Sequence, residues 1–201
     1  AGSQLRVCFL DGSRESQKKV ADIANNWSLY GNISFDFGYS LEGFPRVCHL
    51  SERNEIRVSL RPTPPRNATF IGRSALSRGQ DEPTMWLYNH QERTVLHEFG
   101  HALGLSHVFF HPESCVQDID FAAAVEYFGS RYGWSETHVR LNLRILPGDA
   151  EGYSMLGFDP TSIMQFKLPD EIFDSPEDNC TKNVDSLSLQ DKLAIFRMYP
   201  I

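Results

Sequence analysis

The chain has 201 residues, of which 41% are hydrophobic and 22% charged, a normal composition for one globular domain with its own hydrophobic core. Its formal net charge is −7 and no block of Lys or Arg interrupts it, so neither nucleic acid nor a membrane surface is an expected partner. The apolar runs are far shorter than the roughly 18 residues that span a bilayer, which excludes a transmembrane segment.

The first half of the chain alternates predicted strands with predicted helices. Apolar alternation with β-branched and aromatic residues predicts four strands, over residues 4–10, 33–38, 55–60 and 83–88. Helical spacing of apolar residues predicts helices over 14–30 and from about Gln91 to about Gly104. The three prolines of residues 61–67 predict a loop. This order of elements indicates an α+β fold built around a twisted sheet.

The second half of the chain is less regular. Its apolar spacing predicts helices over 117–130 and 135–143. The stretch 146–185 is rich in Pro, Gly and Asp and is expected to be irregular. Ser188 and Asp191 then form a capping-box pattern, which predicts a final helix.

The four cysteines lie far apart and form no CxxC pair, which excludes zinc-ribbon and thioredoxin-like sites. Two disulfides remain, and four cysteines allow three pairings. We favour Cys8–Cys48 and Cys115–Cys180, because each bridge then stays within one half of the chain.

An oxidising compartment is also indicated by the glycan acceptor pattern Asn-x-Ser/Thr, for which chance would give on the order of one match. Four of the nine asparagines match it: Asn26, Asn32, Asn67 and Asn179. Such sites belong to secreted proteins, so we expect a secreted, extracellular glycoprotein. No signal peptide starts at Ala1, which we interpret as a processed form.

The stretch TVLHEFGHALGLSH (94–107) concentrates three histidines and one glutamate. On a helix, residues four apart are separated by about 40° around the axis and about 6 Å along it, so His97 and His101 can reach one ion. Gly104 can end the helix in a left-handed conformation and let His107 return as a third ligand. Glu98 lies beside the ion. Three protein ligands leave one position for water, as in a catalytic zinc site.

Three alternatives compete with this interpretation. The short pattern HExxH can arise on an ordinary surface helix, but HExxHxxGxxH fixes five positions and sits where the helix should break. A structural zinc site would need a fourth ligand, for which His111 is the nearest candidate. A secreted zinc-binding module that recognises protein or glycan without cleaving it would not need Glu98.

The stretch HEFGHALGLSH (97–107) followed by DPTSIMQF (159–166) resembles the metzincin zinc proteases, and most closely small secreted astacin-like or matrixin-like enzymes. The resemblance implies a zincin fold, with a twisted mixed sheet and the active-site helix in an upper half (1–104). An irregular helical lower half (105–201) would complete the single catalytic domain across a cleft. It also implies that Met164 lies in a turn beneath the metal, as a hydrophobic floor.

The resemblance suggests a substrate-binding region as well. The segment PTMWLY matches the family's edge strand above the cleft, which would place Trp86 and Tyr88 beside an extended peptide. The residues after Met164, beginning with Gln165 and Phe166, would line a specificity pocket.

Three features depart from the family pattern. Astacins usually carry a glutamate after the third histidine, where this chain has Val108, so a buried salt bridge to the N-terminus is not expected. Astacins also carry a tyrosine two residues after the turn methionine, where this chain has Phe166, which cannot ligate or donate. No cysteine-containing propeptide switch is present, although a removed propeptide of a zymogen could carry one.

These patterns predict a secreted, monomeric zinc endopeptidase acting on protein or peptide substrates. One zinc ion would bind His97, His101 and His107, and Glu98 would act as general base and then general acid. The sequence gives no indication about calcium.

Overall fold

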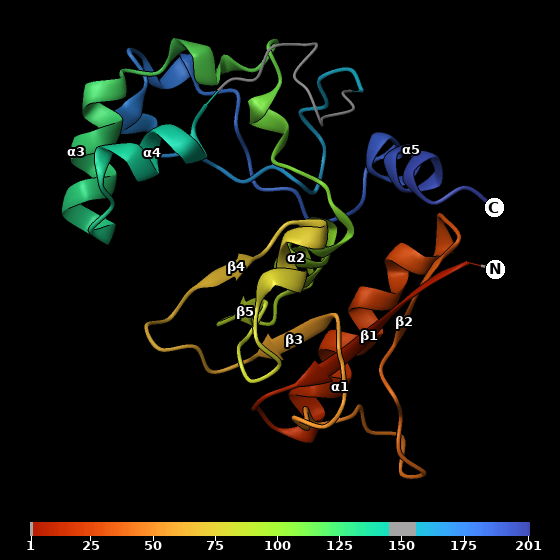
Figure 1. Cartoon of the computed structure of the whole chain (residues 1–201). Coiled ribbons are helices and arrows are strands. Elements are labelled where there is room, and N and C mark those ends of the chain that lie inside the picture. Colours follow the sequence, from red (N-terminus) through yellow and green to blue (C-terminus); the bar gives the residue numbers. More distant parts are fainter. Residues whose placement is uncertain (1, 145–155) are drawn as a thin grey trace. The chain divides into compact units, whose positions relative to one another are not determined.

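The computed structural model describes residues 2–144 and 156–201 (Figure 1). Residues 146–155, part of the stretch expected to be irregular, lie outside the described residues. The chain forms two compact units, which are described in turn: unit 1 combines Ala1–Ser106 with Asp185–Ile201, and unit 2 is His107–Val184. None of the described helices is both long and apolar enough to cross a membrane.

Unit 1 is built on a mixed five-stranded sheet with the strand order β2-β1-β3-β5-β4. Neighbouring strands are parallel except that β4 runs antiparallel to β5. The strands are β1 (Ser3–Phe9), β2 (Ile33–Asp36), β3 (Ile56–Ser59), β4 (Asn67–Thr69) and β5 (Met85–Leu87). The predicted α+β class and mixed sheet are therefore confirmed, with four of the five strands at their predicted places.

The edge strand was predicted wrongly. The segment 83–88 contains β5, which lies between β3 and β4 and has neighbours on both sides. The edge is formed by β4, whose first residue was assigned to the proline-rich loop 61–67. A strand of three residues carries too little alternation to be recognised from sequence, and its pairing with β5 is a tertiary interaction.

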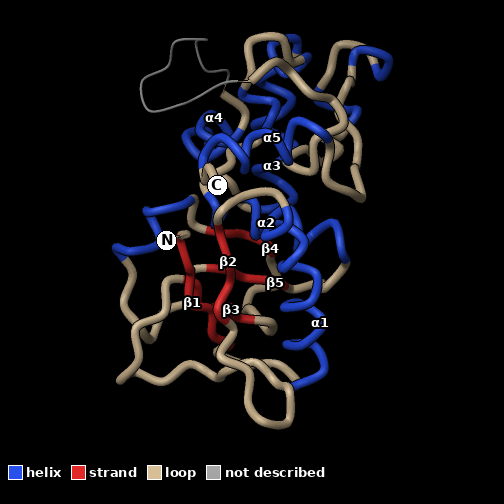
Figure 2. The backbone as a smooth tube through the Cα atoms, turned by 90° about the vertical axis from the view of Figure 1, so that its right-hand side faces the viewer, coloured by secondary structure: helices blue, strands red, loops and turns tan. Residues whose placement is uncertain are grey.

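Helices α1 (Arg14–Ala24) and α2 (Glu92–Leu103) lie side by side against the sheet (Figure 2). The helix predicted over 14–30 is shorter than expected, because residues Asn25–Leu29 continue as a 3₁₀ turn. This turn buries Trp27 completely, and the indole Nε1 donates a hydrogen bond to the Leu96 carbonyl at 3.0 Å. The turn thus ties the end of α1 to the helix that carries the histidines.

The final helix, α5 (Leu189–Met198), packs with unit 1 and begins with the predicted capping box. The Tyr199 hydroxyl donates to the Leu103 carbonyl at 2.9 Å, and the Asn32 backbone N–H donates to the Tyr199 carbonyl at 2.8 Å. These contacts explain why residues 185–201 do not group with the expected lower half 105–201.

The described part of unit 2 contains two helices, α3 (Phe121–Tyr132) and α4 (Glu136–Asn142), with 3₁₀ turns before α3 and after α4. The helix predicted over 117–130 begins later, because the Asp120 carboxylate caps α3 by accepting from the backbone N–H groups of Ala122 and Ala123. Ten buried residues form its core: Phe109, Phe110, Val116, Ala124, Phe128, Val139, Leu143, Leu168, Ile172 and Phe173.

Both disulfides have the favoured pairing, and each lies within one unit. Cys8–Cys48 joins β1 to the segment before β3 in unit 1. Cys115–Cys180 closes a loop with a sequence separation of 65 in unit 2. Because unit 2 has few regular elements, this bridge is a main constraint on its chain.

Candidate metal centre

The first two histidines of the motif lie one turn apart on α2. Their ring centroids are 4.7 Å apart and the rings are nearly perpendicular. His101 is buried, and its Nδ1 lies 2.8 Å from the Leu105 carbonyl oxygen. This contact favours a proton on Nδ1 and leaves Nε2 as the atom that can bind a metal.

Gly104 ends α2 in the left-handed conformation that its position in the motif predicts, with φ of 106°. The Gly104 and Leu105 backbone N–H groups donate to the carbonyls of His101 and Gly100, so these two carbonyls at the end of the helix have hydrogen-bond donors. A Cβ at Gly104 would lie 3.0 Å from the Met198 Cε, so the site is crowded as well as left-handed. The chain then reverses, and His107 follows three residues later.

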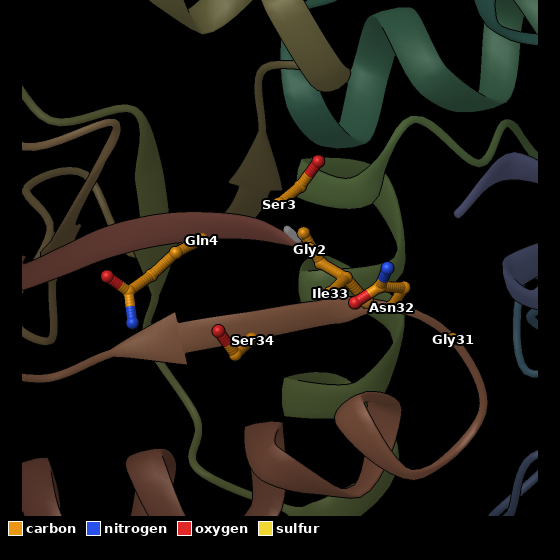
Figure 3. Close-up of a pocket in the computed structure, with 7 residues that line it drawn as sticks. All are labelled: Gly2, Ser3, Gln4, Gly31, Asn32, Ile33 and Ser34. Atoms are coloured by element: carbon orange, nitrogen blue, oxygen red, sulfur yellow. The ribbon is translucent and has the colours of Figure 1, made fainter. Parts of the chain in front are cut away.

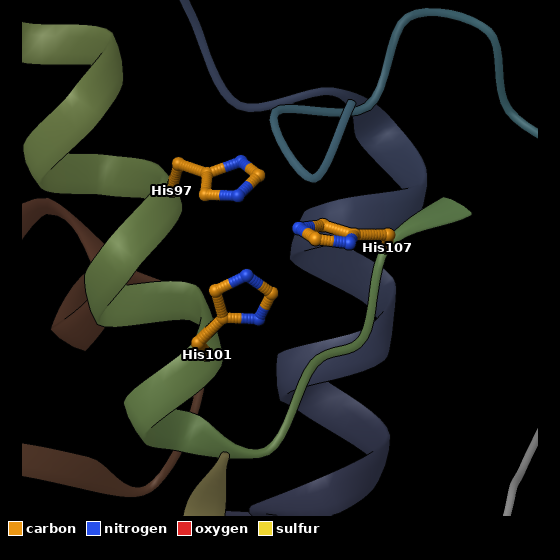
Figure 4. Close-up of side chains that lie close together, drawn as sticks. All are labelled: His97, His101 and His107. Atoms are coloured by element: carbon orange, nitrogen blue, oxygen red, sulfur yellow. The ribbon is translucent and has the colours of Figure 1, made fainter. Parts of the chain in front are cut away.

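The three histidines point toward one another (Figure 4). One nitrogen from each of His97, His101 and His107 lies within 4.8 Å of the others. Zinc takes imidazole nitrogens at about 2.0–2.1 Å, so the three nitrogens would move closer together to share one ion. Burial, with a smaller contribution from His97, lowers the pKa of His101 to about 3, which keeps that imidazole in the neutral form that binds metals. The donor set therefore fits zinc.

Aromatic rings surround His107. Its ring centroid lies 4.7 Å from that of Phe109, 5.6 Å from that of Phe110 and 5.2 Å from that of Phe166. Phe109 is fully buried and also contacts Phe166 edge to face at 5.1 Å. Packing therefore restricts the orientation of this imidazole.

Glu98 lies on α2 between the two helical histidines and is only 5% exposed. The Thr69 hydroxyl donates to its Oε2 at 2.7 Å. Burial raises the pKa of Glu98 to about 7, although the Thr69 hydrogen bond acts in the opposite direction. A carboxyl group with this pKa can both take and give a proton near neutral pH. Sequence reasoning missed Thr69, which it treated only as part of the glycan acceptor pattern at Asn67.

Met164 lies in a tight turn, as expected, and is 2% exposed. The Met164 carbonyl accepts from the Val108 backbone N–H at 3.3 Å, and the Gln165 N–H donates to the Ser162 carbonyl at 3.2 Å. The first of these bonds places the turn beside the residue that follows His107.

The four residues expected to bind substrate differ in their surroundings. Trp86 belongs to the inner strand β5 and lies under the Arg66 guanidinium, with 4.1 Å from that carbon to the ring centroid. Tyr88 is exposed and follows that strand. Gln165 is 3% exposed, and its Nε2 donates to the Pro160 carbonyl within the turn. Phe166 is partly exposed.

His111 is not part of the three-histidine group found among the described residues. Its Nδ1 accepts from the Glu113 backbone N–H at 3.1 Å. A structural zinc site with His111 as fourth ligand is therefore not supported.

A separate hollow of about 370 Å³ is lined by residues 2–4 and 31–34 at the start of β1 and β2 (Figure 3). Its lining has no carboxylate and no histidine, so it offers neither a general base nor an imidazole ligand. The metal-ligand chemistry in the described residues gathers at the histidines.

Two solved structures of myroilysin cover the whole chain, with TM-scores of 0.79 and 0.68 at 28% and 26% identity. The chain in turn spans 94% and 84% of them. High choriolytic enzyme 1, a hatching enzyme zinc-protease from Oryzias latipes (medaka fish), matches with a TM-score of 0.59 at 13% identity, over 98% of this chain and 88% of that one. The chain has the astacin-like metzincin fold. No protein-family model and no curated protein sequence matches it.

The third similarity shows the fold alone, because its identity is low. Together with the two motifs, the matches confirm the resemblance to metzincins that the sequence indicated.

Proposed function

We propose that this metzincin is a secreted zinc-dependent endopeptidase that cleaves protein or peptide substrates. The observation that carries the proposal is the convergence of His97, His101 and His107, with one nitrogen of each within 4.8 Å of the others. Three imidazoles from protein suit a zinc ion that keeps one position for water or substrate. A buried carboxylate, Glu98, accompanies them on the same helix.

Zinc, when bound, polarises the peptide carbonyl and acidifies the attacking water. Glu98 accepts the proton of that water and transfers it to the leaving amine, as general base and then general acid. The burial that raises the pKa of Glu98 makes the second transfer easier, because the protonated form is then accessible near neutral pH.

The substrate is proposed to bind along β4 instead of β5. Within the described residues, β4 is the terminal strand of the sheet, so its outer edge is free to pair with an extended peptide. Backbone hydrogen bonds would then align the peptide in the manner of an added strand. Because β4 also supplies Thr69, which contacts Glu98, this edge leads to the reacting group.

Phe166 is proposed to act as a packing wall. It contacts His107 and Phe109 through its ring and has no hydroxyl that could hold a developing oxyanion. Met164, buried in the adjoining turn, is proposed as the hydrophobic floor of the metal site. Zinc, when bound, would stabilise the oxyanion charge without help from Phe166.

The proposal is tested by comparing the wild-type protein with Glu98→Ala on a peptide library, together with zinc analysis. Wild type should contain one zinc ion per chain and cleave peptides, and chelation should abolish cleavage. Glu98→Ala should retain the metal and lose at least about 10²-fold in kcat, the contribution expected of a general base. Zinc binding without peptide cleavage by wild type would instead favour a recognition module. Near wild-type turnover by Glu98→Ala would contradict the general-base assignment.

A further inference from the structure

The Thr69–Glu98 hydrogen bond joins the edge of the sheet to the proposed reacting group. The Thr69 Oγ1 lies 2.7 Å from the Glu98 Oε2, across a sequence separation of 29. Both residues belong to unit 1. A hydroxyl that donates to a carboxylate at this distance makes a short, charge-assisted bond, stronger than one between neutral groups.

Thr69 is well placed to hold that carboxylate still. It pairs with Met85 in the antiparallel β4–β5 ladder, and β4 packs beside α2 (Figure 1). The Phe70 backbone N–H, the next along the chain, donates to the Thr84 carbonyl at 3.0 Å and fixes the end of the strand. Because threonine is branched at Cβ, its side chain also has few rotamers. The hydroxyl is therefore presented from a restrained backbone by a stiff side chain.

Glu98 needs such support. At 5% exposure, little water can solvate its carboxylate, and its side chain has three rotatable bonds. A proton acceptor displaced by about 1 Å can lose on the order of 10²-fold in rate. With Oε2 engaged by Thr69, Oε1 is the oxygen that remains for proton transfer.

We propose that Thr69 is a positioning residue for catalysis: it fixes Glu98 through Oε2 and links the peptide-binding edge β4 to the proton-transfer group. This inference rests on the proposed function, since it assigns Thr69 a role through Glu98. It adds a residue that no part of the HExxHxxGxxH motif specifies. In this assignment the Thr69 hydroxyl contacts Glu98 and touches neither metal nor substrate.

The decisive comparison is between Thr69→Val and Thr69→Ser in the full chain loaded with zinc. Valine keeps the shape and branching of threonine but removes the hydroxyl, whereas serine keeps the hydroxyl. Thr84→Val is the matched control, because its hydroxyl accepts from the Arg57 N–H at 2.9 Å in the same sheet and does not contact Glu98. For each variant, kcat, KM, zinc content and thermal midpoint are measured.

We expect Thr69→Val to lower kcat by about 10–100-fold, with little change in KM or zinc content, and Thr69→Ser to restore most of kcat. Thr84→Val should lose stability but keep kcat. In a Glu98→Ala background, Thr69→Val should have no further effect on kcat, because the two residues act as one unit.

Wild-type kcat in Thr69→Val, or a loss of kcat that Thr69→Ser does not recover, would overturn the inference. So would an effect on KM alone. If these results came with an active wild type and an inactive Glu98→Ala, the proposed function would stand and only the role of Thr69 would fail. If wild type itself did not cleave peptides, both would fail.

Discussion

Replacing Gly104 by Ala tests whether the left-handed end of α2 is what brings His107 back to the helical histidines. Gly104 has φ of 106°, where an L-residue with a Cβ is strained by roughly 1–2 kcal/mol. Its new methyl group would also lie 3.0 Å from the Met198 Cε, but that flexible end can move. We therefore expect the free energy of unfolding of the zinc-loaded protein to fall by about 1–2 kcal/mol.

The assay is denaturant unfolding with and without zinc, together with zinc titration. If the metal-free chain relaxes by moving His107, zinc binding must restore the strained turn, and each 1.4 kcal/mol of strain weakens zinc affinity about tenfold. If the chain cannot relax, the loss is the same in both forms and zinc affinity is unchanged. A loss of stability that appears only with zinc, together with weaker zinc binding, would mean that the segment after α2 moves freely. An equal loss with and without zinc would mean that the segment is held in place.

Two other glycines serve as controls. Gly43 has φ of 80°, and a methyl group there would meet nothing within 4 Å. Gly43→Ala therefore measures the free-energy cost of backbone strain alone, and its zinc affinity should be unchanged. Gly129 lies inside α3, and its Cβ would make an ordinary 3.5 Å contact, so Gly129→Ala should be neutral or stabilising. If Gly104→Ala proved as stable as Gly129→Ala, with unchanged zinc affinity, the reasoning about this turn would be refuted.

Three further outcomes are expected. Phe166→Leu should cost on the order of 1 kcal/mol in the free energy of unfolding and less than about tenfold in kcat, and a larger kcat loss in a folded, zinc-loaded protein would reveal a catalytic role for the ring. Replacing Cys115 and Cys180 by Ser removes a bridge with a sequence separation of 65. The chain-entropy model then predicts a loss of about 4 kcal/mol in the free energy of unfolding of unit 2, which calorimetry measures. Asn179 should carry no glycan after expression in a glycosylating secretory host, because its Nδ2 donates to two acceptors, at 2.9 and 2.7 Å; peptide mass spectrometry that found a sugar there would contradict this.

The glycan acceptor sites illustrate what sequence reasoning leaves open. All four Asn-x-Ser/Thr matches are equivalent as patterns, but their side chains differ in the structure. The Asn179 Nδ2 is held by two hydrogen bonds, whereas Asn67 is exposed and its Oδ1 accepts from the Tyr88 and Asn89 backbone N–H groups. The sequence pattern therefore identifies candidate glycosylation sites, and the hydrogen bonds of each Asn side chain in the structure distinguish between them.

The convergence of the three candidate metal ligands could be predicted from the sequence because their arrangement is almost entirely local. The spacing of His97 and His101 follows from helical geometry, and Gly104 fixes the reversal that leads to His107. The final helix was predicted for the same reason, since a capping box is a pattern of neighbouring residues. The resemblance carried by the methionine turn then supplied the fold.

The order of the strands was decided only by the tertiary structure. Residues 83–88 have the composition of a strand, but no local feature states whether that strand is inner or outer. The edge position belongs to β4, whose three residues gain their strand conformation from pairing with β5. The packing of residues 185–201 with unit 1 depends in the same way on contacts between distant segments, such as the Tyr199 hydroxyl with the Leu103 carbonyl.

The sequence by itself determined the residues of the candidate metal site: three imidazoles, one carboxylate and a glycine at spacings that helix geometry brings together. What it could not determine is which distant residue contacts Glu98. The hydroxyl of Thr69 reaches Glu98 across 29 residues only because β4 is laid antiparallel on the edge of the sheet, beside α2. Periodicity and spacing encode contacts within a turn or two of the chain, whereas a contact of this range exists only after the sheet has assembled.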